Sequence, residues 1–418
     1  MLDIAAVCLV VTALLAYLNH RFVGLPTTIG VMAGALALSL ALIGLDALGW
    51  VETLRQYEAS LLTSIDFSEV LLQGMLSLLL FAGAMHIDLK ELKSYRWPVL
   101  GLAVGGTLAS TAIVGLLMWW ALPWVGLPLP LLPCLLFGAL ISPTDPIAVL
   151  GIVKSSGAPK NVQLVIAGES LFNDGVGVVI FTLLLGMLAS GDAPTLSHGA
   201  ELLFREVVGG LVLGAALGAA TFFLLRSIDQ YQVEVLLTLA AAFGGYALAS
   251  HLHVSGPLAM VVAGLVVGNH GREFAMSRQT RQHVDLFWEL IDEILNAVLF
   301  VLIGMEVILI PFSEGVAPAV VLAIGVTLLA RTLAVGVPVT LWHARFRLPA
   351  GAGKVLTWGG LRGGISVALA LSLPHGEART LLVPLTYAIV VFSVLVQGLT
   401  IRRVVQRSLA APAAERAR

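Results

Sequence analysis

The amino-acid sequence predicts an all-α polytopic membrane protein with about 13 transmembrane helices. Of its 418 residues, 58% are hydrophobic and only 11% are charged. Apolar windows of about 17–25 residues, long enough to cross a bilayer, recur along the whole chain. Two of these windows contain proline or glycine clusters that a continuous helix does not tolerate. This apolar composition makes membrane lipid the expected environment. The formal net charge of −2 argues against a nucleic-acid partner.

The apolar windows place the spans near residues 2–18, 25–43, 66–86, 98–122, 129–152, 162–189, 201–225, 232–250, 256–269, 290–311, 316–342, 354–374 and 380–400. Two stretches between them, 44–65 and 271–289, mix charged residues with Leu, Trp, Tyr or Phe. We expect these stretches to be amphipathic connectors on the membrane surface.

The distribution of Lys and Arg predicts the orientation. With an odd number of spans, the two termini lie on opposite sides of the membrane. A cytoplasmic C-terminus places 18 of the 23 Lys and Arg residues on the inside and 3 on the outside. Because cytoplasmic loops carry the excess of positive charge, the N-terminus is expected outside.

The sixth span carries a polar cluster at its centre, Glu169-Ser170-Leu171-Phe172-Asn173-Asp174. A carboxylate at the bilayer centre costs at least ~2.5–3.5 kcal/mol on insertion scales, and this cluster has two. At 3.6 residues per turn, Ser170 and Asp174 share one helical face, and Glu169 and Asn173 share the adjoining face. Polar contacts between packed helices are one explanation. A cation or proton site is the other, and it alone accounts for an ionisable acid.

The fifth span contains two prolines three residues apart, in Ile141-Ser-Pro-Thr-Asp-Pro-Ile147. Each proline removes a backbone donor and clashes with the preceding turn. The sequence therefore predicts an unwound segment at mid-membrane that holds Thr144 and Asp145, whose carbonyls and half-helix ends favour a cation. The alternative is a simple proline kink.

The twelfth span contains four glycines around one arginine, in Thr357-Trp-Gly-Gly-Leu-Arg-Gly-Gly-Ile-Ser366. This pattern predicts a second broken helix, in the corresponding place of the other half of the chain. Arg362 stays charged and needs a negative partner. Asp145 is one candidate and the carbonyl end of a broken half-helix is the other, unless Arg362 extends to the membrane interface.

A second arginine, Arg331, lies in the middle of the eleventh span and also needs an acid. We expect a structural salt bridge between Arg331 and Glu169. Asp174 is then the acid without a fixed cation, so a proton and a metal ion compete for its carboxylate. If the site can turn from one side of the membrane to the other only with one of the two ions bound, exchange is obligatory. This is the minimal mechanism of an antiporter.

The span count also suggests an internal repeat within one membrane domain, residues 1–402. Six spans (about 2–189), one linker span (about 201–225) and six more (about 232–402) form an inverted repeat, because the linker span reverses the second half. Residues 403–418 are expected to be a short cytoplasmic tail.

Together these motifs resemble those of the cation/proton antiporter family, in the sodium/proton exchanger branch that includes the bacterial NhaP-type antiporters and the animal exchangers. The matching segments are Pro143–Pro146, Gly168–Asp174, Leu302–Glu306, Arg331, Gly360–Gly363 and Val396–Thr400.

The resemblance implies thirteen helices in two inverted six-helix units, an outside N-terminus, a homodimer, and spans 5 and 12 crossing as broken helices beside span 6. It implies that Asp174 is the shared cation and proton site, with Ser170, Thr144 and Asp145 lining it directly or through water. Glu169 and Arg331 become the buried pair. Asn173 replaces the second aspartate of the electrogenic branch, which implies one proton for one monovalent cation. The function implied is pH and sodium homeostasis at the cell membrane, with no cofactor.

One position departs from the family pattern. Family members carry Glu or Asp in span 3, where this chain has Ala82, so K⁺ or Li⁺ could compete with Na⁺. Two other classes of protein stay open at this point. Asp145 and Asp174 would suit an intramembrane aspartyl protease if they shared a proton, and a channel would conduct cations without moving protons.

Overall fold

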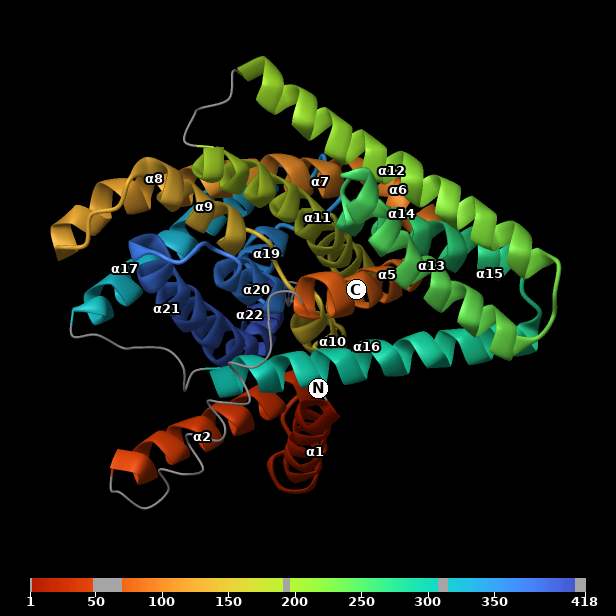
Figure 1. Ribbon diagram of the computed structural model, residues 1–418, viewed down its shortest axis with the longest axis horizontal. Coiled ribbons are helices and arrows are strands. Elements are labelled where there is room, and N and C mark those ends of the chain that lie inside the picture. Colours follow the sequence, from red (N-terminus) through yellow and green to blue (C-terminus); the bar gives the residue numbers. More distant parts are fainter. Residues whose placement is uncertain (1, 48–69, 191–195, 307–314, 410–418) are drawn as a thin grey trace, which may run out of the picture. The chain divides into compact units, whose positions relative to one another are not determined.

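The computed structural model describes residues 2–47, 70–190, 196–306 and 315–409 (Figure 1). Within these ranges the regular elements are helices, which confirms the all-α prediction. By length and composition, eight of the described helices could each cross a membrane, and helical segments overlie all of the predicted spans. The exact number of crossings and the inverted repeat stay predictions. Most of the predicted connector at 44–65 lies outside the described residues.

The chain forms two compact units. The first comprises residues 1–89, 178–313 and 367–387, and the second comprises residues 90–177, 314–366 and 388–418. Four helices contribute residues to both units: α6 (Leu89–Ser94), α11 (Lys160–Ser190), α20 (Gly364–Leu371) and α21 (Glu377–Phe392). The units are therefore built from interleaved parts of the sequence.

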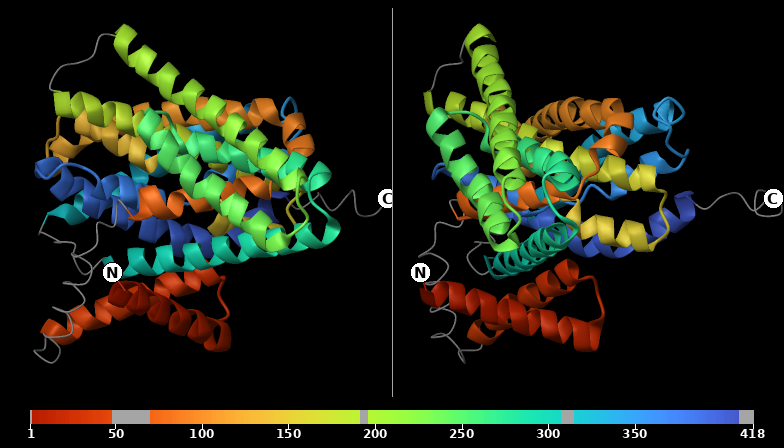
Figure 2. Two further views of the ribbon diagram at one scale, coloured as in Figure 1. Left: turned by 45° about the vertical axis from the view of Figure 1, so that its right-hand side comes forward. Right: turned by 90° about the vertical axis from the view of Figure 1, so that its right-hand side faces the viewer.

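The first unit contains several helices that are long enough to cross a bilayer. Besides the helices shared by both units, it comprises α1 (Leu2–Leu18), η1 (Asn19–Val23), α2 (Thr27–Ala47), η2 (Val70–Met75), α5 (Leu76–Met85), α12 (Leu196–Arg226), α13 (Tyr231–Leu252), α14 (Gly256–Val266), η5 (Val267–Gly271), α15 (Arg272–Phe274) and α16 (Arg278–Glu306). Figure 2 shows α1 and α2 together beside α16 in both views. Val31 and Ala35 of α2 pack there against Val301 and Met305 of α16.

A stripe of glycines lets α12 approach α14 closely. Gly210, Gly214 and Gly218 are spaced by four residues, so they lie on one face of α12. A Cβ added at Gly214 would lie 2.4 Å from the carbonyl oxygen of Ala259. Helix association in lipid depends on this kind of contact, because the apolar tails give helices no hydrophobic reason to associate.

We expect Gly214→Val to destabilise the first unit by roughly 1–3 kcal/mol, because the atom it would strike belongs to the backbone and has no rotamer to change. The measurement is thermal unfolding of the purified protein in detergent. Gly244→Val is the matched control, since nothing lies within 4 Å of a Cβ there. Equal melting temperatures for the two variants would contradict the close contact.

The prediction of a surface connector at 271–289 is wrong for the second half of this stretch. Arg278 begins α16, which continues without interruption to Glu306. Thr280, Val284 and Trp288 recur every four residues and are buried, and Trp288 Nε1 donates a hydrogen bond of 3.0 Å to Thr238 Oγ1. The stretch is amphipathic because one of its faces packs against protein.

The second unit contains the polar motifs identified in the sequence. Its helices are α6 (Leu89–Ser94), α7 (Arg96–Leu100), η3 (Gly101–Gly106), α8 (Thr107–Ala121), η4 (Leu122–Val125), α9 (Leu131–Ile141), α10 (Ile147–Ser155), the first part of α11, α17 (Val316–Arg331), η7 (Thr332–Gly336), α18 (Val337–Trp342), α19 (Ala352–Trp358), η8 (Ser393–Gln397) and α22 (Gly398–Leu409). Because α22 runs to Leu409, the first residues of the predicted tail continue the helix.

Spans 5 and 12 are both interrupted, as the proline and glycine clusters predicted. Helix α9 ends at Ile141 and α10 begins at Ile147. Helix α19 ends at Trp358 and α20 begins at Gly364. Each break leaves backbone groups without partners in their own helix, and these groups need partners elsewhere at membrane depth.

Candidate functional site

The two interrupted spans meet at their breaks. The backbone N–H of Asp145 donates a hydrogen bond of 2.8 Å to the carbonyl oxygen of Leu361. Gly363 is needed at this contact, because a Cβ there would lie 2.7 Å from the Cβ of Asp145. Segments more than 200 residues apart in the sequence therefore supply part of each other's backbone hydrogen bonding.

Arg362 caps the end of the broken helix α9. Its Nη1 donates to the carbonyl oxygens of Ser142 and Pro143, the second at 3.0 Å, and the residue is 2% exposed. The last carbonyls of a helix lack intrahelical donors and carry the negative end of its dipole. The sequence left two candidate partners for Arg362, Asp145 and the carbonyl end of a half-helix. The structure shows that Arg362 binds the carbonyl end.

Helix α11 holds the break of span 5 through Asn173. Its Oδ1 accepts a hydrogen bond of 3.2 Å from the backbone N–H of Thr144, and its Nδ2 donates to Thr144 Oγ1 at 2.8 Å and to Glu169 Oε1 at 3.0 Å. Thr144 Oγ1 also lies 2.9 Å from Ser170 Oγ. The polar residues of spans 5 and 6 therefore form one buried network.

The salt bridge expected between Glu169 and Arg331 is present. Arg331 Nη1 lies 2.6 Å from Glu169 Oε1, and Nη2 lies 2.8 Å from Oε2, so the pair is bidentate. Nη2 also donates to the carbonyl oxygen of Leu356 at 3.2 Å. A Cβ at Gly360 would lie 2.5 Å from Arg331 Nε, so only glycine leaves room for the guanidinium.

Asp174 lies one turn along α11 from Ser170 and is 6% exposed. In the part of the chain that the structure describes, its carboxylate has neither an ion pair nor a hydrogen bond. The charged groups that act on it electrostatically include two other acids, Asp145 and Glu169. The negative charge of Asp174 therefore has no fixed cation among the described residues, in contrast to that of Glu169.

Two residues of span 13 support the break in span 12, and the sequence reasoning gave them no role. Ser393 Oγ accepts the backbone N–H of Arg362 at 2.8 Å, and Gln397 Nε2 donates to the carbonyl oxygen of Trp358 at 3.2 Å. Both are polar residues inside an apolar span, which is the signal that could have identified them.

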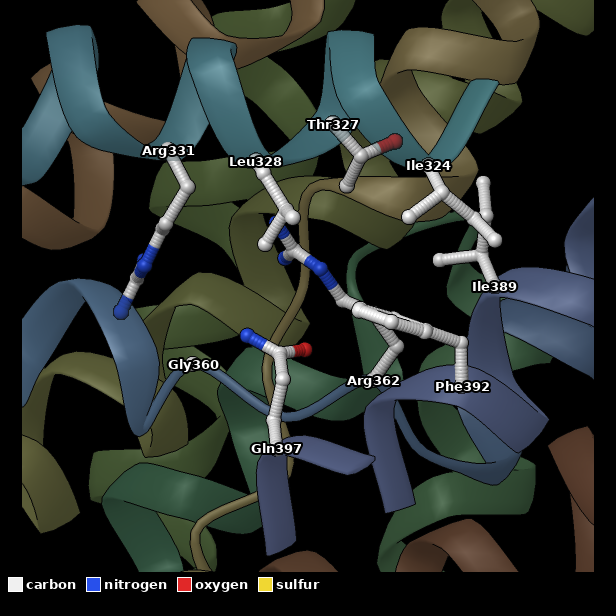
Figure 3. A pocket seen from close by; sticks show the side chains of 9 residues that line it. All are labelled: Ile324, Thr327, Leu328, Arg331, Gly360, Arg362, Ile389, Phe392 and Gln397. Atoms are coloured by element: carbon white, nitrogen blue, oxygen red, sulfur yellow. The ribbon is translucent and has the colours of Figure 1, made fainter. Parts of the chain in front are cut away.

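Figure 3 shows Arg331, Thr327 and neighbouring side chains of α17 on one side of a small cavity, with Arg362 and Gln397 on the other side. Its volume is about 10 Å³, enough for about one water molecule. Arg331 Nε and Thr327 Oγ1 are buried and have no hydrogen-bond partner among the described residues. The cavity therefore has room for one water molecule beside these two polar atoms and is too small for an organic ligand.

Comparison with known proteins identifies the class. A family model described as "Sodium/hydrogen exchanger, transmembrane" matches residues 10–407. The chain belongs to the sodium/hydrogen exchanger family. Over 413 residues, this exchanger is 55% identical to the Na(+)/H(+) antiporter NhaP of Pseudomonas aeruginosa, and the alignment covers 97% of both chains.

More distant relatives agree. The exchanger is 36% identical over 378 residues to the Na(+)/H(+) antiporter NhaH of Halobacillus dabanensis, which covers 89% of this chain and 91% of the relative. Its fold matches the solved structure of the sodium proton antiporter MjNhaP1 of Methanocaldococcus jannaschii, with a TM-score of 0.73, 18% sequence identity, and coverage of 97% of this chain and 98% of the other.

These findings decide between the functional classes that the sequence left open. The exchanger is a multi-pass membrane protein and a secondary antiporter, as predicted, and it is not an enzyme. The protease and channel alternatives were wrong. The transported ions are substrates, and antiport needs no cofactor beside them.

Proposed function

We propose that this exchanger moves Na⁺ across the cell membrane in exchange for H⁺, and that Asp174 carries both ions in turn. The observation that supports this role is the contrast between the two acids of α11. Arg331 neutralises Glu169 permanently, whereas the buried carboxylate of Asp174 has no fixed cation in the described chain.

The coupling follows from the cost of an empty site. A charged carboxylate at the bilayer centre costs at least ~2.5–3.5 kcal/mol, and either a proton or a bound cation removes that charge. The site therefore turns readily from one side of the membrane to the other in two states, with Asp174 protonated or with Na⁺ bound. Since one carboxylate does not bind both at once, inward movement of one ion requires outward movement of the other.

Thr144, Ser170 and Asp145 complete the proposed cation site. Alkali cations are hard ions that take oxygen ligands, and these residues offer two hydroxyls and a carboxylate beside Asp174. The hydrogen bonds between Thr144, Ser170 and Asn173 hold the unwound segment against α11. We assign Asn173 to the same site as the residue that positions Thr144, because its amide is already bonded to Thr144 and Glu169.

The stoichiometry proposed is one proton for one cation, without net charge movement. Asn173 Nδ2 donates to Glu169 Oε1, so an aspartate there would place two acceptors against each other and would repel Glu169. We therefore expect the exchange rate of reconstituted vesicles to be the same at zero membrane potential and at a potential imposed by K⁺ and valinomycin. A rate that rises with the potential would contradict electroneutral exchange.

Na⁺ is the proposed main substrate, with Li⁺ and K⁺ as possible competitors. Ala82 is fully buried in α5 and supplies no ligand of its own. The test is the pH change inside proteoliposomes on addition of Na⁺, Li⁺ or K⁺ at equal ionic strength. We expect the largest rise of the internal pH with Na⁺ and Li⁺, because each cation that enters the vesicle expels a proton. If no cation changes the internal pH, the proposed function is wrong.

The proposal includes a homodimer in the cell membrane with the N-terminus outside and the C-terminus in the cytoplasm. The Lys and Arg asymmetry supports the orientation. Labelling of single cysteines introduced in the loops with a membrane-impermeant maleimide tests it, after both native cysteines, Cys8 and Cys134, are replaced. The mass of the protein in detergent measures the oligomeric state.

A further inference from the structure

A groove of about 460 Å³ lies within the second unit, apart from the network around Asp174. Its lining comes from three segments: Thr332, Gly336 and Leu341 from η7 and α18, Thr357 and Trp358 from α19, and Val404 from α22. The volume is in the range of pockets that hold small molecules or parts of larger ligands.

The threonine hydroxyls and the tryptophan N–H of the groove are already bonded within the protein. The hydroxyls of Thr332, Thr340 and Thr357 each donate to the carbonyl oxygen four residues earlier, at 2.7, 2.7 and 2.8 Å. Trp358 Nε1 donates to Thr400 Oγ1 at 2.8 Å. The walls therefore present methyl groups and ring atoms, which suit an apolar chain.

One end of the groove is cationic. Lys354 is an exposed lining residue, and Arg407 is exposed one turn beyond Val404 on α22. Helix α22 packs against the start of α19 at this end, where a Cβ at Gly351 would lie 1.9 Å from the carbonyl oxygen of Ser408. Neither Lys354 nor Arg407 forms an ion pair with any residue that the structure describes, so both charges are available to an anion.

The surroundings of the groove are those of a bilayer-facing surface. On α18, the lining residue Leu341 is 69% exposed and its neighbour Trp342 is 53% exposed. Side chains of this size are exposed to lipid in membrane helices, and Trp is typical of the interface with the headgroups. An apolar channel with a basic end at such a surface matches the chemistry of an anionic lipid.

We propose that this groove binds one acyl chain of an anionic phospholipid, whose phosphate contacts Lys354 and Arg407. A zwitterionic lipid would fill the channel equally well, but its quaternary ammonium group would offset the attraction between its phosphate and the two cationic side chains. The preference for an anionic headgroup therefore depends on the basic end of the groove. The binding of the acyl chain depends on the apolar walls. This site is independent of the proposed ion exchange.

Native mass spectrometry of the full-length protein in detergent tests the proposal, with phosphatidylglycerol and phosphatidylcholine of identical acyl chains as probes. We expect the wild type to retain one phosphatidylglycerol in preference to phosphatidylcholine. In Lys354→Gln/Arg407→Gln, the affinity for phosphatidylglycerol should fall about fivefold for each charge removed, with phosphatidylcholine unaffected. The matched control Arg278→Gln/Arg281→Gln removes two exposed charges of α16 in the first unit and should bind as the wild type does.

A second measurement places the lipid in the groove. Phosphatidylglycerol with brominated acyl chains should quench Trp358 in nanodiscs, measured as the difference between the wild type and Trp358→Phe, and Val404→Trp should displace the lipid. Equal retention of the two lipids by the wild type would overturn the proposal, as would unchanged phosphatidylglycerol binding in the double variant. Gel filtration and thermal unfolding confirm that each variant is folded.

Discussion

Asp174→Asn is expected to reduce cation-dependent proton movement to the level of empty vesicles while the protein stays folded. Asparagine has nearly the shape of aspartate, but it binds neither a proton nor an alkali cation as a carboxylate does. The described structure gives Asp174 no ion pair to lose, so its neutralisation leaves no buried charge uncompensated. Loss of transport without loss of stability is the combination that distinguishes an ion carrier from a structural acid.

The measurement is the internal pH of proteoliposomes after addition of Na⁺, with protein amount and melting temperature determined for each variant. Asp174→Glu keeps the carboxylate and should retain reduced exchange. Asp285→Asn is the matched control, since it makes the same chemical change in the partly exposed pair with Arg272 and should exchange normally. Sodium-dependent pH change in Asp174→Asn would remove this residue from its assigned role.

The sequence predicted the features whose cause is local. Pro143 and Pro146 in span 5 and the glycines around Arg362 in span 12 interrupt helices for reasons of backbone geometry alone, and the structure has breaks at both places. That Arg331 needs an acidic partner was also predictable, because a buried guanidinium cannot lose its proton. These inferences need no knowledge of tertiary structure.

The partners of the breaks depend on contacts between distant segments. The carbonyls of Ser142 and Pro143 that bind Arg362 could not be chosen over Asp145 from the sequence, because each satisfies a guanidinium. The start of α16 was misassigned for a related reason. A buried face toward protein and a buried face toward lipid headgroups give the same amphipathic pattern, and they are distinguished by tertiary contacts such as that of Trp288 with Thr238.

The second large effect is expected at the pair of Glu169 and Arg331. Removal of one charge leaves the other buried without compensation, which costs roughly 3–5 kcal/mol. Glu169→Gln or Arg331→Gln should therefore lower the melting temperature and the yield of folded protein before either variant changes cation preference. The bidentate geometry and the additional hydrogen bond from Asn173 to Glu169 place this cost at the high end of that range.

The double variant Glu169→Gln/Arg331→Gln separates charge from packing. It leaves no unpaired charge, so its loss of stability should be smaller than the sum of the two single losses. Arg272→Gln serves as the control, because it breaks a pair whose side chains are 22% and 26% exposed, and such pairs contribute only ~0.2–1 kcal/mol. Additive losses in the double variant would mean that the two residues stabilise the fold separately. Unchanged stability with altered cation preference in Glu169→Gln would instead make Glu169 a ligand of the transported ion, and Asp174 would no longer be the single carrier.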